Sequence, residues 1–548
     1  MFELFFFSIL SVIITTPFGF ILFNQSNNTI NLSNQLIYGT IVISFIALLI
    51  NFFFPLNSTS NTLILILPLL IILKNPKTYF SLNFLRFVTF SSLIMFLLVA
   101  KSNIYRPDAI LYHLPYTDIL NNEKIIFGLS NLHFRYAHIS IIQYFSAFFN
   151  NFIFGSKGIV LAIAIIASAT IINFLSYAIN YIKLKNFNFH SFYIFFILIF
   201  IAYKMNRYGE YGNDAPTHFL FFFLISEIIQ SFNNKNIKFC SNKLLLAIFI
   251  ILNKITMAFA IFLPFIFLKK EQFWYICKNP KFYFSILFLA LWLLKNIIVS
   301  GCVVYPISQL CFKNLEWTNI NLTKKVSQEN EAWTKAWPDF KNDNNISQEE
   351  YSSKFRWIKT WSNSHLKKII KILVPYIIFL IAFYLLVDFK YKNKKVFNHN
   401  IHHKKIVTLF SLMVVFSIIW FLKVPVYRYG YSYFVSFFAL FFAYICVYKY
   451  SIKENFYKFY RFCLIFFSII FILKNTVKIF NPEDMNFTSF FPKIIFLEKS
   501  NIKKIQLNDF IYNESNNMCG YNYSPCTHYQ KLKLKSKKYF NYTVIIPY

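Results

Sequence analysis

The chain has 548 residues, of which 57% are hydrophobic and only 14% are charged. A soluble domain carries about 25% charged residues, so this composition argues against a soluble enzyme. The formal net charge of +33 does not indicate a nucleic-acid partner, because much of the lysine lies in short segments between apolar runs and no basic motif has base-reading chemistry.

Apolar runs long enough to cross a bilayer recur along the whole chain. The run 62–73 is short, and the run 243–268 is interrupted by Asn253 and Lys254, which favours a hairpin of two short helices. The sequence therefore predicts an all-α polytopic membrane protein with about 12 or 13 transmembrane helices. The clear spans are 2–23, 36–54, 84–100, 158–182, 190–203, 216–231, 281–299, 369–388, 405–422, 431–449 and 459–474.

Lysine-rich connections fall on one side of the membrane when these spans are followed in order, and such loops stay in the cytoplasm. They are 74–86, 183–186, 233–243, 269–281, 390–405 and 449–461. The alternating segments are then outside: 101–157, 204–215, 300–368, 423–430 and the tail from 475. We therefore expect a transmembrane domain, 1–474, and a small extracytoplasmic C-terminal domain, 475–548, which closes with the strand-like run "YTVIIPY".

The first large outer loop, 101–157, contains the polar stretch "RPDAILYHLPYTDILNNEKIIFG". Pro107 suits the first turn of a helix, and Asp108 would stand at its positive end. The amphipathic spacing predicts a helix lying in the outer interface, kinked at Pro115 and ended by Gly128. Asp108 has three possible roles there: a general base, a cation ligand or a simple helix cap.

Further charged residues are expected at the same side of the membrane. Arg135 and His138 in "HFRYAH" have i, i+3 spacing, and the next outer loop, "NRYGEYGNDAPTHF", supplies Arg207, Glu210 and Asp214. Transfer from an anionic phosphate donor needs a base for the acceptor and cations for the leaving phosphate. The placement of these residues favours such a reaction.

Four cysteines lie in the expected outer segments. An oxidising exterior would pair Cys302 with Cys311 and Cys519 with Cys526, although free thiols remain the alternative. The outer loop 300–368 is rich in Trp, which suits either sugar rings or the membrane interface. The His402–His403 pair lies in a positive segment without acidic neighbours, so we predict no metal site there.

The order of "PDAILYHLP", a glycine and "NLHFRYAH" resembles the GT-C superfamily of integral membrane glycosyltransferases, which includes protein O-mannosyltransferases and the aminoarabinose transferases of lipid A. The resemblance covers about residues 84–435. It implies a bundle of helices in a bacterial inner (plasma) membrane, with a catalytic acid in the first large outer loop. The active site would face the periplasm or exterior.

The resemblance also suggests roles for individual residues. Asp108 matches the catalytic acid, Asp214 in "YGNDAP" a second acidic position, and Lys254 in "LNKITM" a recurrent lysine at a hairpin turn. Arg428 in "VPVYRYGYSYF" would bind phosphate. Many relatives have adjacent acidic residues in the first loop, but here Ala109 follows Asp108. A divalent metal is therefore possible but not required by the pattern.

The expected function is transfer of a sugar from a polyprenyl-phosphate donor to a glycolipid or glycan acceptor, among membrane lipids and without a nucleic acid. Asp108 would be the catalytic base, while Arg135, Arg207, His113 and His138 would contact phosphate or substrate. Two alternatives remain open. A polysaccharide polymerase or ligase would depend on the outer-loop Arg and His instead, and a transporter would have charges at mid-membrane depth and internal repeats.

Overall fold

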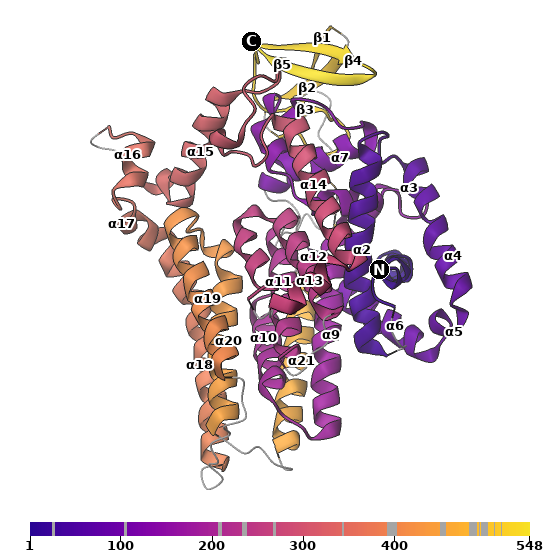
Figure 1. Cartoon of the computed structure of the whole chain (residues 1–548), viewed down its shortest axis with the longest axis vertical. Helices are drawn as coiled ribbons and strands as arrows, with labels where there is room; N and C mark the ends of the chain where they lie inside the picture. The colour runs from indigo at the N-terminus through magenta and orange to yellow at the C-terminus, as the bar shows by residue number, and fades with distance from the viewer. Residues whose placement is uncertain are drawn as a thin grey trace.

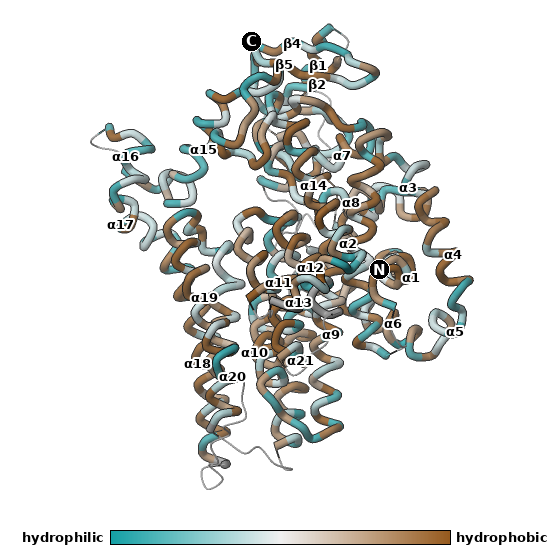
Figure 2. The backbone as a smooth tube through the Cα atoms, viewed as in Figure 1, coloured by the Kyte–Doolittle hydropathy of each residue, from teal (hydrophilic) through white to brown (hydrophobic). Residues whose placement is uncertain are grey.

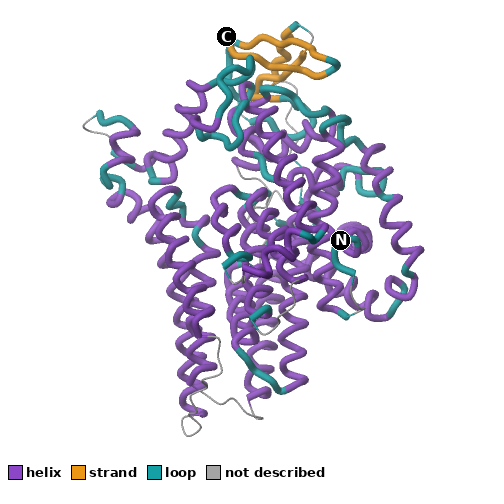
Figure 3. Tube along the Cα trace, viewed as in Figure 1, coloured by secondary structure: helices purple, strands orange, loops and turns teal. Residues whose placement is uncertain are grey.

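The protein is seen in a computed structural model. It describes residues 1–24, 28–102, 107–205, 211–232, 238–266, 270–341, 345–391, 403–449, 456–481, 490–492, 494, 502–508, 510–516 and 518–548. Long helices lie side by side through most of the molecule, and a small group of strands lies at one end together with the C-terminus (Figure 1). Figure 3 shows the same separation of helix and strand.

The first half of the chain forms the helices beside the N-terminus and the centre of the bundle. Its α-helices are α1 (Phe2–Phe20), α2 (Thr29–Asn51), α3 (Ser58–Ile64), α4 (Ile66–Lys74), α5 (Pro76–Tyr79), α6 (Leu82–Val99), α7 (Leu114–Asn122), α8 (Ile141–Phe148), α9 (Ala162–Leu184), α10 (Phe189–Lys204), α11 (Asp214–Gln230) and α12 (Lys238–Asn253). Shorter turns are η1 (Ala109–His113), η2 (Leu129–Asn131), η3 (Phe134–His138), η4 (Gly155–Leu161) and η5 (Ile255–Phe262).

The second half adds a long hairpin, an outer helical segment and the strands. Its α-helices are α13 (Lys270–Cys277), α14 (Pro280–Ser300), α15 (Ile320–Thr334), α16 (Gln348–Ser353), α17 (Ile358–Trp361), α18 (Lys367–Tyr391), α19 (His403–Lys423), α20 (Tyr431–Lys449) and α21 (Phe456–Phe480). Its turns are η6 (Ser308–Leu310), η7 (Trp337–Asp339), η8 (Ser362–Leu366) and η10 (Tyr427–Tyr429). The strands are β1 (Ile502–Leu507), β2 (Phe510–Ser515), β3 (Cys526–Thr527), β4 (Leu534–Tyr539) and β5 (Tyr542–Pro547).

Within the described ranges, nine helical segments are long and apolar enough to cross a membrane. Three shorter apolar helices, Ser58–Lys74, Phe189–Lys204 and Ser241–Asn253, and the 17-residue α11 correspond to the other expected spans. Figure 2 shows hydrophobic residues along the long helices and a mixture of hydrophobic and hydrophilic residues on the strands. The protein is a multi-pass membrane protein, and the predicted fold class is confirmed.

The interruption expected at Asn253 and Lys254 is present, but the second helix of the expected hairpin is different from the prediction. Helix α12 ends at Asn253, and Lys254 has an extended backbone with φ −154° and ψ 109°. The next segment, η5, is a 3₁₀ helix rather than an α-helix. The break therefore leaves the Lys254 side chain at a helix junction and not in the middle of a continuous span.

The first outer loop forms a helix that is shorter than its spacing suggests. Residues 107–122 are one run of helix, in which the π-helical segment η1 leads directly into α7. The expected end at Gly128 is not observed, because α7 ends at Asn122 and Gly128 starts η2 with a left-handed φ of 67°. Pro115 lies in the first turn of α7, directly after η1. Residues 114–121 are all buried, so other parts of the protein enclose this helix.

The C-terminal tail, residues 502–548, covers this loop. The Phe127 N–H donates to the Thr543 carbonyl and the Ile545 N–H donates to the Phe127 carbonyl, both at 2.9 Å, so β5 pairs with the loop. The Ser524 N–H donates to the Asp118 carboxylate at 2.9 Å. These contacts bury α7, because the apolar surface that would face lipid or water instead faces the tail.

Strands and disulfides order the tail itself. Antiparallel β1 and β2 form one sheet with the short parallel strand β3, and β4 pairs antiparallel with β5. Cys519 is bonded to Cys526, with Cα atoms 5.6 Å apart, and Cys302 is bonded to Cys311. Both predicted pairings are confirmed, as is the strand at "YTVIIP".

Candidate functional site

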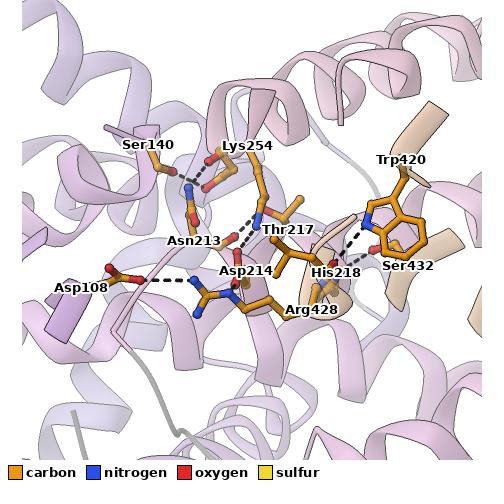
Figure 4. A network of polar contacts seen from close by, with 12 residues as sticks. Asp108, Ser140, Asn213, Asp214, Thr217, His218, Lys254, Trp420, Arg428 and Ser432 are labelled. Atoms are coloured by element: carbon orange, nitrogen blue, oxygen red, sulfur yellow. Dashed lines mark hydrogen bonds and ion pairs between the residues drawn. The ribbon is translucent and has the colours of Figure 1, made fainter. Parts of the chain in front are cut away.

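One arginine lies between two carboxylates that are far apart in the sequence. Arg428 Nη2 is 3.3 Å from Asp108 Oδ2, and Arg428 Nε is 3.1 Å from Asp214 Oδ2 (Figure 4). Asp108 directly precedes η1, Asp214 is the first residue of α11, and Arg428 belongs to η10. The guanidinium thus joins the first outer loop, the bundle and the α19–α20 connection.

Two more cations complete the group. Lys254 Nζ forms an ion pair with Asp214 Oδ1 and lies 3.3 Å from the centre of the Tyr429 ring. Arg135 Nη1 is 3.7 Å from Asp108 Oδ1. Asp108, Arg135, Asp214, Lys254 and Arg428 are called the ion cluster below. It contains three cations and two carboxylates, so its formal charge is positive and an anion is its natural ligand.

The end of α12 lies beside the start of α11, and this contact places Lys254 against Asp214. Asn213, just before α11, donates from Nδ2 to the Asn253 carbonyl at 2.9 Å. Ser140 at the start of α8 donates to Asn253 Oδ1 at 3.2 Å. Because the last residue of α12 is held on two sides, the next side chain is directed at the N-terminus of α11 (Figure 4).

The backbone on both sides of Arg428 is fixed by side chains of the bundle. His218, one turn into α11, contacts the Arg428 carbonyl through Nε2 at 2.9 Å and the Ser432 hydroxyl through Nδ1 at 2.5 Å. Trp420 of α19 donates from Nε1 to the Val426 carbonyl at 3.1 Å. Figure 4 shows these groups behind the guanidinium. The arginine is therefore held in place before any ligand arrives.

Neighbouring positive charges keep the Asp214 carboxylate ionised. Burial alone would raise the pKa of Asp214, but the neighbouring Lys254 and Arg428 outweigh it and hold that pKa below its usual value. The N-terminus of α11 also favours a negative charge at this position. Asp108 is more accessible than Asp214, since its side chain is 34% exposed and that of Asp214 is 19% exposed. Asp108 is thus the carboxylate that a substrate can reach more easily.

Asp108 does not act as a helix cap. Its side chain makes no capping hydrogen bond to the turn that follows, and its oxygens face Arg135 and Arg428 instead. Of the three roles that the sequence left open, the cap is therefore not observed. A base or a cation ligand remains compatible with the geometry.

Two predicted histidines lie beside the cluster and contact other groups. His113 is buried and its Nδ1 lies 2.9 Å from Gln143 Nε2, while burial lowers its pKa to about 4. His138 packs edge-on against Tyr305, with ring centres 5.0 Å apart. Neither makes a hydrogen bond to an Asp of the ion cluster in the described part of the chain. Arg207 and Glu210 lie outside the described residues.

Aromatic rings under the cations were not anticipated from the sequence. Tyr429 lies beneath Lys254, and Tyr112 lies beneath Arg135 at 5.0 Å from ring centre to guanidinium carbon. Such faces attract cations and can orient them. For Tyr429 the signal was present, because it is adjacent to Arg428 in "VYRYGY". Nothing in the spacing pointed to Tyr112.

Comparison with known proteins places the ion cluster in a recognised family. Residues 1–435 match the family described as Domain of unknown function (DUF8201). The chain belongs to this family. No curated protein and no solved structure matches it. All five residues of the ion cluster lie inside the DUF8201 match, whereas α21 and the strands of the tail lie beyond it.

Among the residues whose placement is described, no three or more His, Cys, Asp or Glu side chains are grouped so as to hold a metal ion. The two carboxylates of the ion cluster are both paired with cations.

Proposed function

We propose that this protein is an integral membrane glycosyltransferase that moves a sugar from a polyprenyl-phosphate donor to a lipid or glycan acceptor. The observation that best supports this is Arg428 held between Asp108 and Asp214. An Arg fork matches the oxygens of a phosphate, and an accessible carboxylate beside it supplies a base. The lysine-rich connections favour the outer face for this site, and the resemblance to GT-C glycosyltransferases favours a bacterial plasma membrane.

In the proposed reaction, Asp108, Arg428 and Lys254 have separate roles. The Asp108 carboxylate takes the proton of the acceptor hydroxyl as that oxygen attacks the anomeric carbon of the donor. The bond from this carbon to the phosphate oxygen breaks, and its electron pair stays on the departing polyprenyl phosphate. Arg428 and Lys254 stabilise the charge that develops on the phosphate. The configuration at the anomeric carbon is inverted.

The ion pairs of the cluster suggest an order of events. Asp108 is held by Arg428 at 3.3 Å and by Arg135 at 3.7 Å. A phosphate competes with Asp108 for Arg428, because both are oxygen anions. Donor binding would then leave Asp108 with only the longer contact to Arg135, so its Oδ2 is free to meet the acceptor hydroxyl when the donor is in place.

The test is transfer by the purified full-length protein in liposomes, with radiolabelled polyprenyl-phosphate sugars and a glycolipid extract. Asp108→Asn keeps the shape of the side chain but cannot accept a proton, so we expect turnover to fall about 10²–10⁴-fold. Glu316→Gln is the matched control, because Glu316 is an outer carboxylate paired with Lys537 outside the cluster. An Asp108→Asn protein that folds and retains full turnover would refute the assignment.

A further inference from the structure

Aromatic side chains from two distant parts of the chain meet beside the ion cluster. Phe134 belongs to η3 in the first outer loop and Tyr529 to the C-terminal tail, and their ring centres are 6.2 Å apart. The His133 ring centre is 5.5 Å from that of Phe134 and 5.2 Å from that of Tyr529. The His528 ring centre is 4.2 Å from that of Tyr529. His133, Phe134, His528 and Tyr529 are called the aromatic cluster below.

Arg135 connects the aromatic cluster to the proposed base. Its guanidinium carbon is 5.4 Å from the centre of the Phe134 ring, and its Nη1 is 3.7 Å from Asp108 Oδ1. Asp108, Phe134, Arg135 and Tyr529 are all partly exposed. The two ends of this row of contacts are therefore close enough for one short oligosaccharide to touch both Tyr529 and Asp108.

Hydrogen bonds determine which nitrogen of each histidine carries the proton. Burial lowers the pKa of His133 and of His528, so both rings are neutral near pH 7. The Arg135 N–H donates to His133 Nδ1 at 3.1 Å, so the His133 proton is on Nε2. His133 Nε2 then donates to His528 Nδ1 at 3.1 Å.

The same chain of bonds leaves one oriented donor at the surface. Because His528 Nδ1 is an acceptor, the proton of this ring is on Nε2. That N–H makes no hydrogen bond to another described residue, and the His528 side chain is partly exposed. An N–H group is therefore available to a ligand beside the Tyr529 ring.

The tail is anchored where it contributes to the aromatic cluster. The Tyr136 hydroxyl donates to the Cys526 carbonyl at 2.5 Å, and Cys526 is also bonded to Cys519. The Tyr529 N–H donates to Thr527 Oγ1 at 3.2 Å. The aromatic cluster is thus formed before a ligand binds, which lowers the entropic cost of binding.

We propose that the aromatic cluster is an acceptor subsite that binds a sugar ring of the glycan whose hydroxyl Asp108 deprotonates. The C–H face of a pyranose is apolar and packs on an aromatic ring, while a sugar hydroxyl accepts from the His528 N–H. A few placed polar groups among aromatic side chains are typical of small-molecule sites. This inference rests on the proposed sugar transfer and adds that the acceptor is recognised through its sugar.

The position of Tyr529 has a consequence for specificity. The ion cluster lies inside the match to DUF8201, residues 1–435, whereas Tyr529 and His528 lie beyond it. The residues proposed to carry out the transfer and half of those proposed to select the acceptor are therefore in different parts of the chain.

The first arm of the test measures binding without a donor and without turnover. The full chain in phosphatidylcholine nanodiscs is titrated with the oligosaccharides that mild acid releases from the glycolipid extract, and binding is followed by saturation-transfer NMR. Tyr529→Ala should weaken binding about 10-fold. Tyr529→Phe should bind like the wild type, because it keeps the ring. Tyr539→Ala is the matched control, because Tyr539 is an exposed tyrosine of the same tail, in β4.

The second arm measures transfer to the intact glycolipid extract. Tyr529→Ala should raise the KM for the acceptor about 10-fold and leave the KM for the polyprenyl-phosphate donor unchanged, because Arg428 and Lys254 lie outside the aromatic cluster. Binding of the released oligosaccharides assigns recognition to the glycan alone. An effect of Tyr529→Ala in the second arm only assigns it to a lipid-linked glycan, and this also supports the subsite.

Phe134→Leu tests the other side of the contact, because leucine is apolar but has no ring face. It should weaken binding as Tyr529→Ala does, and it decides the question if Tyr529→Ala does not fold. Binding and acceptor KM that are the same in these variants and in the wild type would overturn the subsite, while transfer itself could still occur. A wild type that responds in neither arm would overturn it as well. Tyr529-dependent binding by a protein without transfer activity would support the subsite and refute the transferase assignment.

Discussion

The contact between Gly128 and the last strand offers a direct test of how the tail holds the first outer loop. A Cβ at Gly128 would lie 2.2 Å from the Ile545 carbonyl oxygen and 2.7 Å from Trp317 Cβ. Neither atom is the end of a flexible side chain, so β5 must move. The two hydrogen bonds that join Phe127 to Thr543 and Ile545 would then be lost.

Gly155 provides the reference for the stability that Gly128→Ala should lose. Gly155 also has a left-handed backbone, with φ 56°, but a Cβ there would meet nothing within 4 Å. Gly155→Ala should therefore cost only the backbone strain, about 1 kcal/mol. Gly128→Ala adds the loss of two hydrogen bonds at about 1 kcal/mol each, which gives a total of about 3 kcal/mol.

The assay compares the two variants by Tm and by tryptic cleavage in β4, which contains Lys535, Lys537 and Lys538. Release of the tail in Gly128→Ala should speed this cleavage under conditions in which the helices stay folded. Gly155→Ala should leave it close to the wild-type rate. Equal cleavage rates and equal losses of Tm in the two variants would refute the view that β5 is anchored on the first loop.

Two further predictions concern the same tail. His133 Nε2 and His528 Nδ1 share a hydrogen bond at 3.1 Å, and burial is the main reason that both pKa values are lowered. In the unfolded chain these two histidines bind protons near pH 6.5, whereas in the folded chain they do so only at lower pH. The free energy of unfolding should therefore fall as the pH drops below about 6.5. His528→Gln should flatten this dependence of Tm on pH, and an unchanged slope would contradict the reasoning. Replacing Cys519 and Cys526 by serine opens a loop with a sequence separation of 7 and should destabilise the tail by about 2.4 kcal/mol in the loop-closure model. Tryptic cleavage of β4 checks this, and a rate equal to that of the wild type would count against it.

The members of the ion cluster could be selected from the sequence, but their pairing could not. In an apolar chain, charged residues at the ends of spans stand out, and this drew attention to Asp108, Arg135 and Asp214, whereas Lys254 and Arg428 were pointed out by the resemblance to membrane glycosyltransferases. That Arg428 contacts both carboxylates follows from the packing of α11 against α20 and from the bonds of His218. No local pattern contains this information.

The first outer loop shows where local patterns fail. Its apolar spacing is helical up to Asn122, and the structure confirms a helix there. No local pattern indicates that residues near 543–545 pair with Phe127, because strand pairing at long separation leaves no local period. The tail therefore covers part of the helix expected in the outer interface. His138 was expected to contact substrate, and its ring packs on Tyr305.

The long separation between the first loop and β5 has a consequence for biogenesis. Asn131 donates from Nδ2 to the Ile545 carbonyl across 414 residues of chain. At usual rates of synthesis, the loop has to wait roughly 20–80 s after it is made before its partner strand exists. Arg428 is likewise synthesised after both carboxylates that it joins, while Arg135 and Lys254 are available earlier. The ion cluster therefore cannot close until synthesis has passed Arg428, and a product truncated before that residue would insert into the membrane without an assembled site.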